Sequence, residues 1–541
     1  MTIRMLDRIA VVAYGAAAVL CGTGAGLAQD SAAITRTSSA PMEFPLRAMH
    51  AAGHWGTNEL VVADWNADPA QALVPVDYLA WLKRLHVNWI GLSVALTYDD
   101  SMDSTVERDT EGSENPSFSD DVLRQAIREF RAEGIDVYLT LAFEAHEAES
   151  AERPVQRWQL GDSGDDEGGP CCDSGIQPDF WPWRPSHPDH QTFVAEFWES
   201  YTQQAIHVAT LAEEEGVRMF SLGTETDRLF RTRANEYFMN DFAPELRSMV
   251  DRMRAVYSGL LTYDMHYDAI INPDFYGPGS GAGQLWNDLD LDVVGISAWF
   301  PLADAPPSTV MSFEDARAQY GRIISEHLVP LAARNPGRPI MFLEYGAMDL
   351  LESPSAPSDS AGFPPLVLED ADGSGLDDGR EVQANIYQGM LSAMNGYPGI
   401  VNALFLWDNW LASDERWASY WAGRRSFAVR DKLSEGIVRA VYTRWASDSS
   451  PIAVGEIPSQ TVTAGRPLPL QVSLAPYFSD PEDDQLAYSA WSSDSSVARV
   501  ATTWSVLQIA ADETGEATVA VTATDGKGWA TQTFEVTSAG P

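Results

Sequence analysis

Short apolar runs alternate with longer amphipathic segments along most of this chain. The runs at 87–96, 135–143, 217–224, 260–266, 291–300, 339–343 and 400–407 predict buried strands. The segments at 76–85, 120–133, 190–215, 234–257, 313–333, 381–394 and 433–445 predict helices. With a first strand within 46–64, this regular alternation predicts an α/β fold, a (β/α)8 barrel over residues 46–447.

The composition changes near residues 448–455. Residues 456–538 are rich in Thr, Val, Ser and Ala and contain short alternating runs such as ATVAVTATD and TFEVT. Alternation with a period of two is typical of half-buried strands, so we expect a small C-terminal all-β sandwich domain. The pieces SDPEDDQLAYSA and VTATDGKG resemble cadherin-like or immunoglobulin-like modules.

The first 28 residues have the pattern of a signal peptide. Arg4 and Arg8 precede an apolar run over 9–20, and small residues stand before Gln29. Residues 29–45 are polar and predict a disordered linker. We therefore expect a secreted protein, extracellular or periplasmic, without a membrane span. After signal removal the remaining cysteines are Cys171 and Cys172, whose redox state the sequence leaves open.

Two predicted strands end in a glutamate. VRMFSLGTETD places Glu225 at the end of one strand, and PIMFLEYG places Glu344 at the end of another. The carboxyl ends of barrel strands form the catalytic face of this fold. Two carboxyl groups on that face suggest an acid/base and a nucleophile, although each could also be a solvated loop residue.

The charge of the chain restricts its partners. Lys and Arg number 35 against 78 Asp and Glu, which gives a formal net charge of −43. Nucleic-acid binding requires a basic surface, so this class of partner is excluded, and a neutral substrate is favoured. A metal-dependent hydrolase is disfavoured because no HExxH motif or histidine cluster is present.

The predicted barrel resembles a clan A glycoside hydrolase, and most of all glycoside hydrolase family 113, a family of β-mannanases. The motifs that carry the resemblance are, in chain order, LGTETD, LTYDMH, VVGISAWFPL, FLEYG and LFLWDNW. The resemblance implies a retaining endo-β-1,4-mannanase that acts on mannan or a related β-glycan and needs no cofactor for its chemistry. We also expect a monomer. The resemblance also implies that Glu225 is the acid/base and Glu344 the nucleophile.

The same resemblance assigns substrate contacts to four further residues, Trp407, Trp299, His266 and Thr224. Trp407 would stack under the sugar ring, or else pack in the core. The other three depart from the clan pattern. Thr224 and His266 stand where Asn is common, and Trp299 stands, with Phe300, where a Tyr often bonds the nucleophile. These departures leave the preference for mannan open.

The segment DADGSGLDDGRE matches the twelve-residue calcium loop. The matching ligand positions are Asp370, Asp372, Ser374, Asp378 and Glu381. The alternative is an acidic surface loop without an ion.

Two other functions remain open at this point. The chain could be a non-catalytic polysaccharide-binding or adhesion protein on a decayed barrel, or a retaining hydrolase of another β-glycan. The two intact glutamates favour an enzyme. Exact sugar, linkage, endo or exo action, and the ligand of the C-terminal module are not determined by the sequence.

Overall fold

The computed structural model describes most of the chain from residue 44 onward. The described residues are 44–51, 74, 76–98, 103–110, 117–145, 157, 160–161, 182–234, 240–272, 283–335, 337–358, 364–407, 423–447, 449–466, 468–481, 485–525 and 528–540. Outside these residues lie the predicted signal peptide, the predicted linker up to residue 43, and the two cysteines Cys171 and Cys172. The signal peptide and the linker stay predictions, and the redox state of the cysteines stays open.

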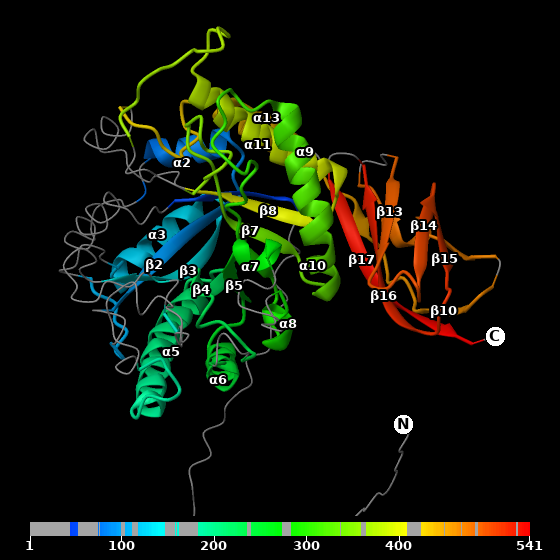
Figure 1. The fold of residues 1–541 in the computed structure, drawn as a ribbon, viewed down its shortest axis with the longest axis horizontal. Coiled ribbons are helices and arrows are strands. Elements are labelled where there is room, and N and C mark those ends of the chain that lie inside the picture. The colour runs from blue at the N-terminus through cyan, green and yellow to red at the C-terminus, as the bar shows by residue number, and fades with distance from the viewer. Residues whose placement is uncertain are drawn as a thin grey trace, which may run out of the picture. The chain divides into compact units, whose positions relative to one another are not determined.

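Eight parallel strands form a closed barrel in chain order, as predicted (Figure 1). The barrel closes because β1 pairs with both β2 and β8, which are the second and last strands of the series. The strands are β1 (Leu46–His50), β2 (Trp89–Tyr98), β3 (Asp136–Ala145), β4 (Met219–Thr224), β5 (Leu260–His266), β6 (Val294–Ser297), β7 (Ile340–Tyr345) and β8 (Val401–Leu406).

Helices connect successive strands, a last helix follows β8, and Figure 1 shows them around the barrel. They are α2 (Val76–Arg84), α3 (Asp120–Ala132), α5 (His190–Glu214), α6 (Ala243–Arg254), α7 (Asp268–Ile271), α8 (Leu285–Asp288), α9 (Phe313–Ile323), α10 (Val329–Arg334), α11 (Asp378–Gly396) and α13 (Leu433–Ala446). The prediction started the helix after β4 too early, because α6 begins at Ala243, next to Pro244 in its first turn. The predicted helix at 313–333 contains the π-helical turn η3 (Ile324–Leu328) between α9 and α10.

Two apolar layers hold the barrel together. Inside it, side chains from several strands form a small cluster that includes Trp89, Tyr138 and Phe405. Between the strands and the surrounding helices lies the much larger cluster, to which Phe220 and Phe342 belong. Alternate residues of a strand therefore face the barrel axis and the helices, as the pleat of a strand requires.

This alternation is interrupted in the strands that carry the two glutamates. Between β6 and β7 the register shifts after Ile296 and Phe342, and Ser297 pairs with Glu344. Leu343 packs inside the barrel, and strict alternation would then turn Glu344 outward. The extra residue turns Glu344 toward the barrel mouth, as a β-bulge does beside many active sites. A similar shift between β4 and β5 pairs Thr224 with Asp264.

The C-terminal region is all-β, as predicted. Strands β10 (Gln460–Thr463), β13 (Ala487–Ser492), β16 (Gly515–Thr524) and β17 (Trp529–Ala539) form one sheet in the order β10-β17-β16-β13. A second sheet contains β11 (Leu470–Ser473), β14 (Arg499–Thr503) and β15 (Val506–Ala510), and a small third one pairs β9 (Ile452–Ala453) with β12 (Phe478–Ser479). Most of their apolar residues form a core of their own, while Trp529 at the start of β17 packs in the large cluster of the barrel.

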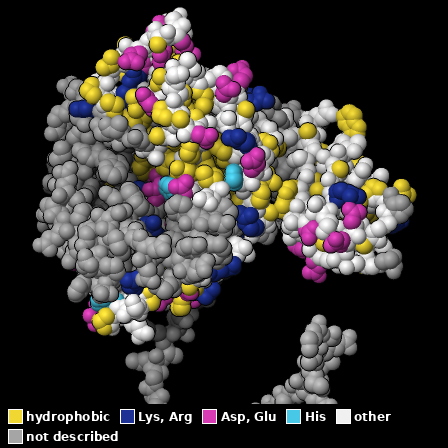
Figure 2. All heavy atoms as spheres, in the orientation of Figure 1, with side chains coloured by type: hydrophobic (Ala, Val, Ile, Leu, Met, Phe, Trp, Pro, Cys, Tyr) yellow, Lys and Arg dark blue, Asp and Glu magenta, His cyan; other side chains and the backbone are white. Residues whose placement is uncertain are grey.

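In the described part of the chain, no helix is both long enough and apolar enough to cross a membrane. Among the described residues on the face shown in Figure 2, acidic side chains lie at several separate places and not in a single patch.

Replacement of Gly295 with Ala should destabilise the barrel. A Cβ atom there would lie 2.4 Å from Leu343 Cδ1 and 2.6 Å from the Tyr263 carbonyl oxygen. Overpacking of this kind costs about 1–3 kcal/mol, so the urea midpoint should fall. The control is Gly436→Ala in α13, where no atom lies within 4 Å of the new Cβ and helix propensity should add up to about 1 kcal/mol. Equal midpoints for the two variants would contradict the packing described here.

Candidate active site

The two predicted glutamates meet at the carboxyl ends of their strands. The Ser297 hydroxyl lies 2.6 Å from Glu225 Oε1 and 3.2 Å from Glu344 Oε2. Because both contacts end on one oxygen atom, the two carboxylate oxygens are separated by no more than the sum of these distances. That bound is below the roughly 6.5–9.5 Å of inverting glycosidases and is compatible with the roughly 5–5.5 Å of retaining ones.

Glu344 is buried, with 3% of its surface exposed, and is surrounded by donors. The Thr224 hydroxyl lies 3.1 Å from Oε1, and the Trp299 indole N–H donates to Oε2 over 3.1 Å. Trp299 thus takes the place of the Tyr that often hydrogen-bonds the nucleophile in clan A glycoside hydrolases, which the sequence resembles. These hydrogen bonds favour the ionised form of the carboxylate, whereas its burial opposes ionisation.

Glu225 is held in an unusual backbone conformation. Its φ is 51°, in the left-handed region that residues other than glycine rarely adopt. Its N–H donates to the Asp264 carbonyl oxygen over 3.0 Å, which fixes the bend at the end of β4. Its carboxylate accepts from the Arg157 guanidinium over 2.9 Å at Oε2. Strain of this kind costs about 1–3 kcal/mol and is common at active sites.

The two glutamates have opposite pKa shifts. For Glu344, burial and then the charge of Glu225 raise the pKa to about 7. Burial also opposes ionisation of Glu225, but Arg157, His266 and the hydrogen bond from Ser297 outweigh it and lower its pKa. In the free site the shared proton is therefore favoured on Glu344.

Two aspartates lie beside this pair. Asp227 accepts hydrogen bonds from the Tyr263 hydroxyl, at 2.6 Å, and from the His266 backbone N–H. Burial raises the pKa of Asp227 to about 6. Asp264 is 1% exposed, and its Oδ2 lies 3.0 Å from the Thr224 hydroxyl. Burial and the charges of the two glutamates raise its pKa well above the usual range.

The two predicted tryptophans belong to a small apolar cluster with Met348 and Phe427. Trp299 and Trp407 meet edge to face, with ring centroids 6.3 Å apart, and each is 4% exposed. Trp407 also lies against the His50 ring, at 4.4 Å. Most of the Trp407 side chain is therefore packed against other residues, as the core-packing alternative predicts. His266 is half-buried near Glu225, while its Nδ1 accepts from the Asp268 backbone N–H.

The structure thus gathers Glu225, Glu344, Thr224, Trp299 and His266 at one site. Sequence reasoning missed Arg157, Ser297 and Asp264. Ser297 and Asp264 stand within the motifs VVGISAWFPL and LTYDMH, so their position on inward-facing strand ends was available as a signal. Nothing in the local sequence around Arg157 indicates its partner, which lies 68 residues further along the chain.

The predicted calcium loop, residues 370–381, lies apart from the two glutamates in the sequence. It precedes α11 and overlaps the first turn of this helix, which begins at Asp378. Carboxylate oxygens of Asp370, Asp372 and Asp378 lie within 4.8 Å of one another. Of the other two predicted ligands, the Ser374 hydroxyl donates to Glu381 Oε2 over 3.0 Å. Three of the five positions therefore already form a group that fits a hard cation with oxygen ligands.

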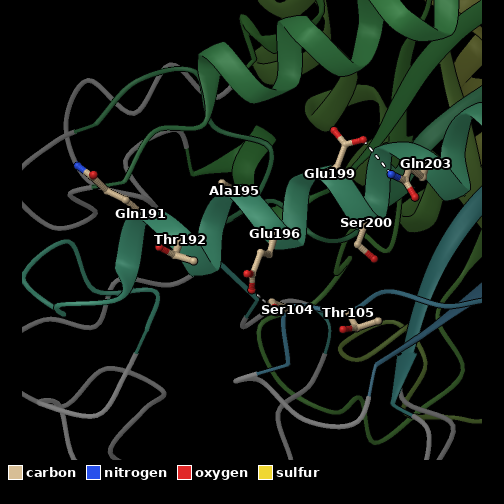
Figure 3. A pocket seen from close by; sticks show the side chains of 9 residues that line it. All are labelled: Ser104, Thr105, Gln191, Thr192, Ala195, Glu196, Glu199, Ser200 and Gln203. Carbon is tan, nitrogen blue, oxygen red and sulfur yellow. Dashed lines mark hydrogen bonds between the residues drawn. The ribbon is translucent and has the colours of Figure 1, made fainter.

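A hollow of about 710 Å³ lies on the outer side of α5, and Figure 3 shows the polar side chains that line it. The 103–110 segment forms one side of it, where Ser104 donates to Glu196. Neither glutamate lines this hollow, so we do not assign the reaction to it.

Residues 183–432 match the family model described as Glycoside Hydrolase Family 113, and residues 448–537 match that of a bacterial Ig domain. No curated protein matches the chain. Among solved structures, a GH113 β-1,4-mannanase in complex is 19% identical, with a TM-score of 0.49, and covers 74% of this chain and 99% of its own.

Two further solved structures show the range of similarity. A GH113 β-mannanase from Alicyclobacillus acidocaldarius is 18% identical, with a TM-score of 0.47, over 74% of this chain and 98% of its own. An endo-β-1,4-mannanase from Thermotoga petrophila is 12% identical, with a TM-score of 0.40, over 92% of this chain and 99% of its own. All three TM-scores are below 0.5, so the classification of this chain rests on the family match and on the site, not on these structures.

The barrel, its paired carboxyl groups and the family match together define a glycoside hydrolase. More narrowly, residues 183–432 match glycoside hydrolase family 113, and residues 448–537, which follow them, match a bacterial Ig domain.

Replacement of Arg157 with Gln should move the pH profile of kcat/KM to higher pH. Arg157 lowers the pKa of both glutamates, so its loss raises both. The basic limb then moves up because Glu344, the group with the higher pKa, holds its proton longer, and the acidic limb moves up because Glu225 accepts a second proton at higher pH. The profile is measured on whichever member of a mannan, glucan and xylan panel the enzyme cleaves.

Arg252→Gln is the matched control, because Arg252 pairs with Glu199 on the surface. Its profile should coincide with that of the wild type. A profile for Arg157→Gln that is unmoved, or moved to lower pH, would contradict the electrostatic role of Arg157.

Proposed function

We propose that this glycoside hydrolase is a secreted endo-β-1,4-mannanase that works by double displacement with retention. Glu344 is the nucleophile and Glu225 the acid/base. The observation that carries the proposal is the single Ser297 hydroxyl between the two carboxyl groups, which sets a separation suited to direct attack. The preference for mannan is supported by the family match, and export by the signal-peptide pattern.

In the first step, Glu344 attacks C1 of the sugar and the C1–O bond to the leaving group breaks. The proton of Glu225 passes to the leaving oxygen, which departs as a neutral hydroxyl. In the second step, Glu225 takes a proton from water, and the water oxygen displaces Glu344 from C1. The product has the original anomeric configuration, and both carboxyl groups return to their starting states.

The reaction requires the proton on Glu225, whereas the free site favours it on Glu344. Ser297 offers a route between them, because its hydroxyl can receive a proton from Glu344 Oε2 and release its own to Glu225 Oε1. A sugar ring that excludes water and places the leaving oxygen beside Glu225 would favour this transfer. Above about pH 7 Glu344 loses this proton, and the rate should fall because no proton remains for the leaving oxygen. A second proton enters only below the lowered pKa of Glu225, and the rate should then fall again as the nucleophile is lost.

Trp299 and Trp407 would line the sugar site beside the nucleophile. Trp299 contributes through its N–H bond to Glu344, while Trp407 offers the remaining exposed part of its ring. Thr224 and His266 flank the same space. The carboxyl groups supply acid, base and nucleophile, so the proposed chemistry uses no cofactor.

Replacement of Glu344 with Ala should reduce turnover by several orders of magnitude, because no covalent intermediate can form. Added azide should then attack C1 from the vacated face and give an α-linked glycosyl azide, identified by NMR. Glu225→Ala should instead give a β-linked azide, because the intermediate still forms on Glu344 and azide replaces water in the second step.

Obtaining the α-linked product from Glu225→Ala would reverse the two roles. Retained activity in Glu344→Ala would refute the proposed mechanism altogether. The same polysaccharide panel tests the substrate, since cleavage of glucan or xylan without mannan would favour a hydrolase of another β-glycan.

The loop Asp370–Glu381 stays a predicted calcium site. An ion bound only by the folded protein stabilises it by mass action. Calcium should therefore raise the melting temperature of the full chain by a few degrees, and a chelator should reverse this. Asp372→Ala should remove most of the response, while Asp304→Ala, at an exposed aspartate outside the loop, should keep it. An unchanged melting curve with calcium would leave a plain acidic loop.

A further inference from the structure

One buried carboxyl group at the active site has no role in the two displacement steps. Asp264 lies on β5, where it pairs with Thr224 of β4 on one side and with Gly295 of β6 on the other. Its exposure is 1%. A carboxyl group in such a place is costly unless it is neutral or fully hydrogen-bonded.

The contacts of Asp264 form a chain that ends on the nucleophile. Asp264 Oδ2 lies 3.0 Å from Thr224 Oγ1, and the same Thr224 oxygen lies 3.1 Å from Glu344 Oε1. The other oxygen, Asp264 Oδ1, has no hydrogen-bond partner among the described residues. Thr224 is itself fully buried, so these contacts are removed from bulk water.

The number of hydrogen atoms available in this hydrogen-bond chain indicates that one of its carboxyl groups is protonated. The Thr224 hydroxyl has one hydrogen but lies within bonding distance of two carboxyl oxygens. If both contacts are hydrogen bonds, one of the carboxyl groups must carry a proton and donate it to Thr224. The donor is either Asp264 or Glu344.

The surroundings favour Asp264 as the donor. As an anion, Asp264 would have one donor and one bare buried oxygen, whereas Glu344 has donors at both oxygens, including Ser297 and Trp299 at Oε2. The charged and titratable groups around Asp264 are Glu225 and Asp227 after β4, Glu344 on β7, His266 on β5, Tyr138 on β3, and Arg157 on Glu225. The nearby carboxylates oppose a further negative charge there.

We propose that Asp264 is a positioning residue that stays protonated in the working enzyme and donates through Thr224 to Glu344. The proton of Asp264 points to Thr224, the Thr224 hydrogen points to Glu344 Oε1, and the nucleophile is held ionised and oriented toward C1. This inference rests on the proposed role of Glu344.

The hydrogen-bond chain Asp264–Thr224–Glu344 also gives a physical reason for a threonine at position 224, directly before Glu225. A hydroxyl can accept from Asp264 and donate to Glu344 through the same oxygen atom. Serine would preserve this relay, whereas valine, of similar shape, would remove it.

Kinetics of paired variants test the relay. Asp264→Ala should lower kcat by about 10- to 100-fold, the effect expected for losing a hydrogen bond to a charged group. It should also move the basic limb of the pH profile to higher pH, because loss of a donor to the Glu344 anion raises the pKa of Glu344, the higher of the pair. Asp264→Asn supplies an uncharged N–H donor in the same place and should recover most of the lost kcat and the position of the limb.

Thr224 provides the second pair. Thr224→Val should reproduce the loss and the shift of Asp264→Ala, and Thr224→Ser should recover both. The double variant Asp264→Ala with Thr224→Val should be little worse than either single variant, because both break the same chain. If Asp264→Asn is as impaired as Asp264→Ala, Asp264 acts as an anion and the proposal fails.

Infrared spectroscopy of the full chain with ¹³C-labelled aspartate tests the proton without turnover. Asp227 loses its proton at about pH 6, so a protonated aspartate band that persists at higher pH and disappears in Asp264→Asn belongs to Asp264. Absence of this band would overturn the proposal. If the band is present but Glu344→Ala gives no glycosyl azide, the role of Glu344 is wrong while Asp264 is still protonated.

Discussion

The central constraint on this molecule is that several carboxyl groups share one buried space at the barrel mouth. Each would repel the others if all were ionised, and burial weakens the screening by water. The structure meets the constraint with a single guanidinium on Glu225, two hydroxyl bridges, and an indole N–H on Glu344. The same repulsion makes the site useful, because it keeps protons at carboxyl groups near neutral pH.

The barrel provides the geometry that this arrangement requires. Ser297 and Thr224 can each bridge two carboxyl groups only because neighbouring strands end at the same level. The register shifts in β4 and β7 turn polar side chains inward at the point where the apolar interior of the barrel ends. Below that level the interior is filled by side chains such as Trp89 and Phe405, so the site has a rigid base.

Parts of the chain away from the mouth have a less defined relation to the chemistry. The C-terminal sheets have their own apolar core and supply no strand to the barrel. The acidic loop before α11 follows β7, the strand of Glu344, and the Asp377 side chain at the start of the helix accepts from the Arg380 N–H over 3.0 Å. An ion in that loop would therefore act on the start of one helix, and not directly on the reacting atoms.

The sequence alone determined the order of strands and helices, the change to an all-β module, and the two glutamates at strand ends. Local patterns carry this information, since apolar periodicity marks each element and a polar residue after an apolar run marks a strand end. What only the tertiary structure decided is which side chains meet. Arg157 reaches Glu225 across 68 residues of chain, and a register shift, rather than any local pattern, turns Glu344 inward. The protonation of Asp264 likewise depends on charges and burial contributed by other strands, which no local stretch of sequence contains.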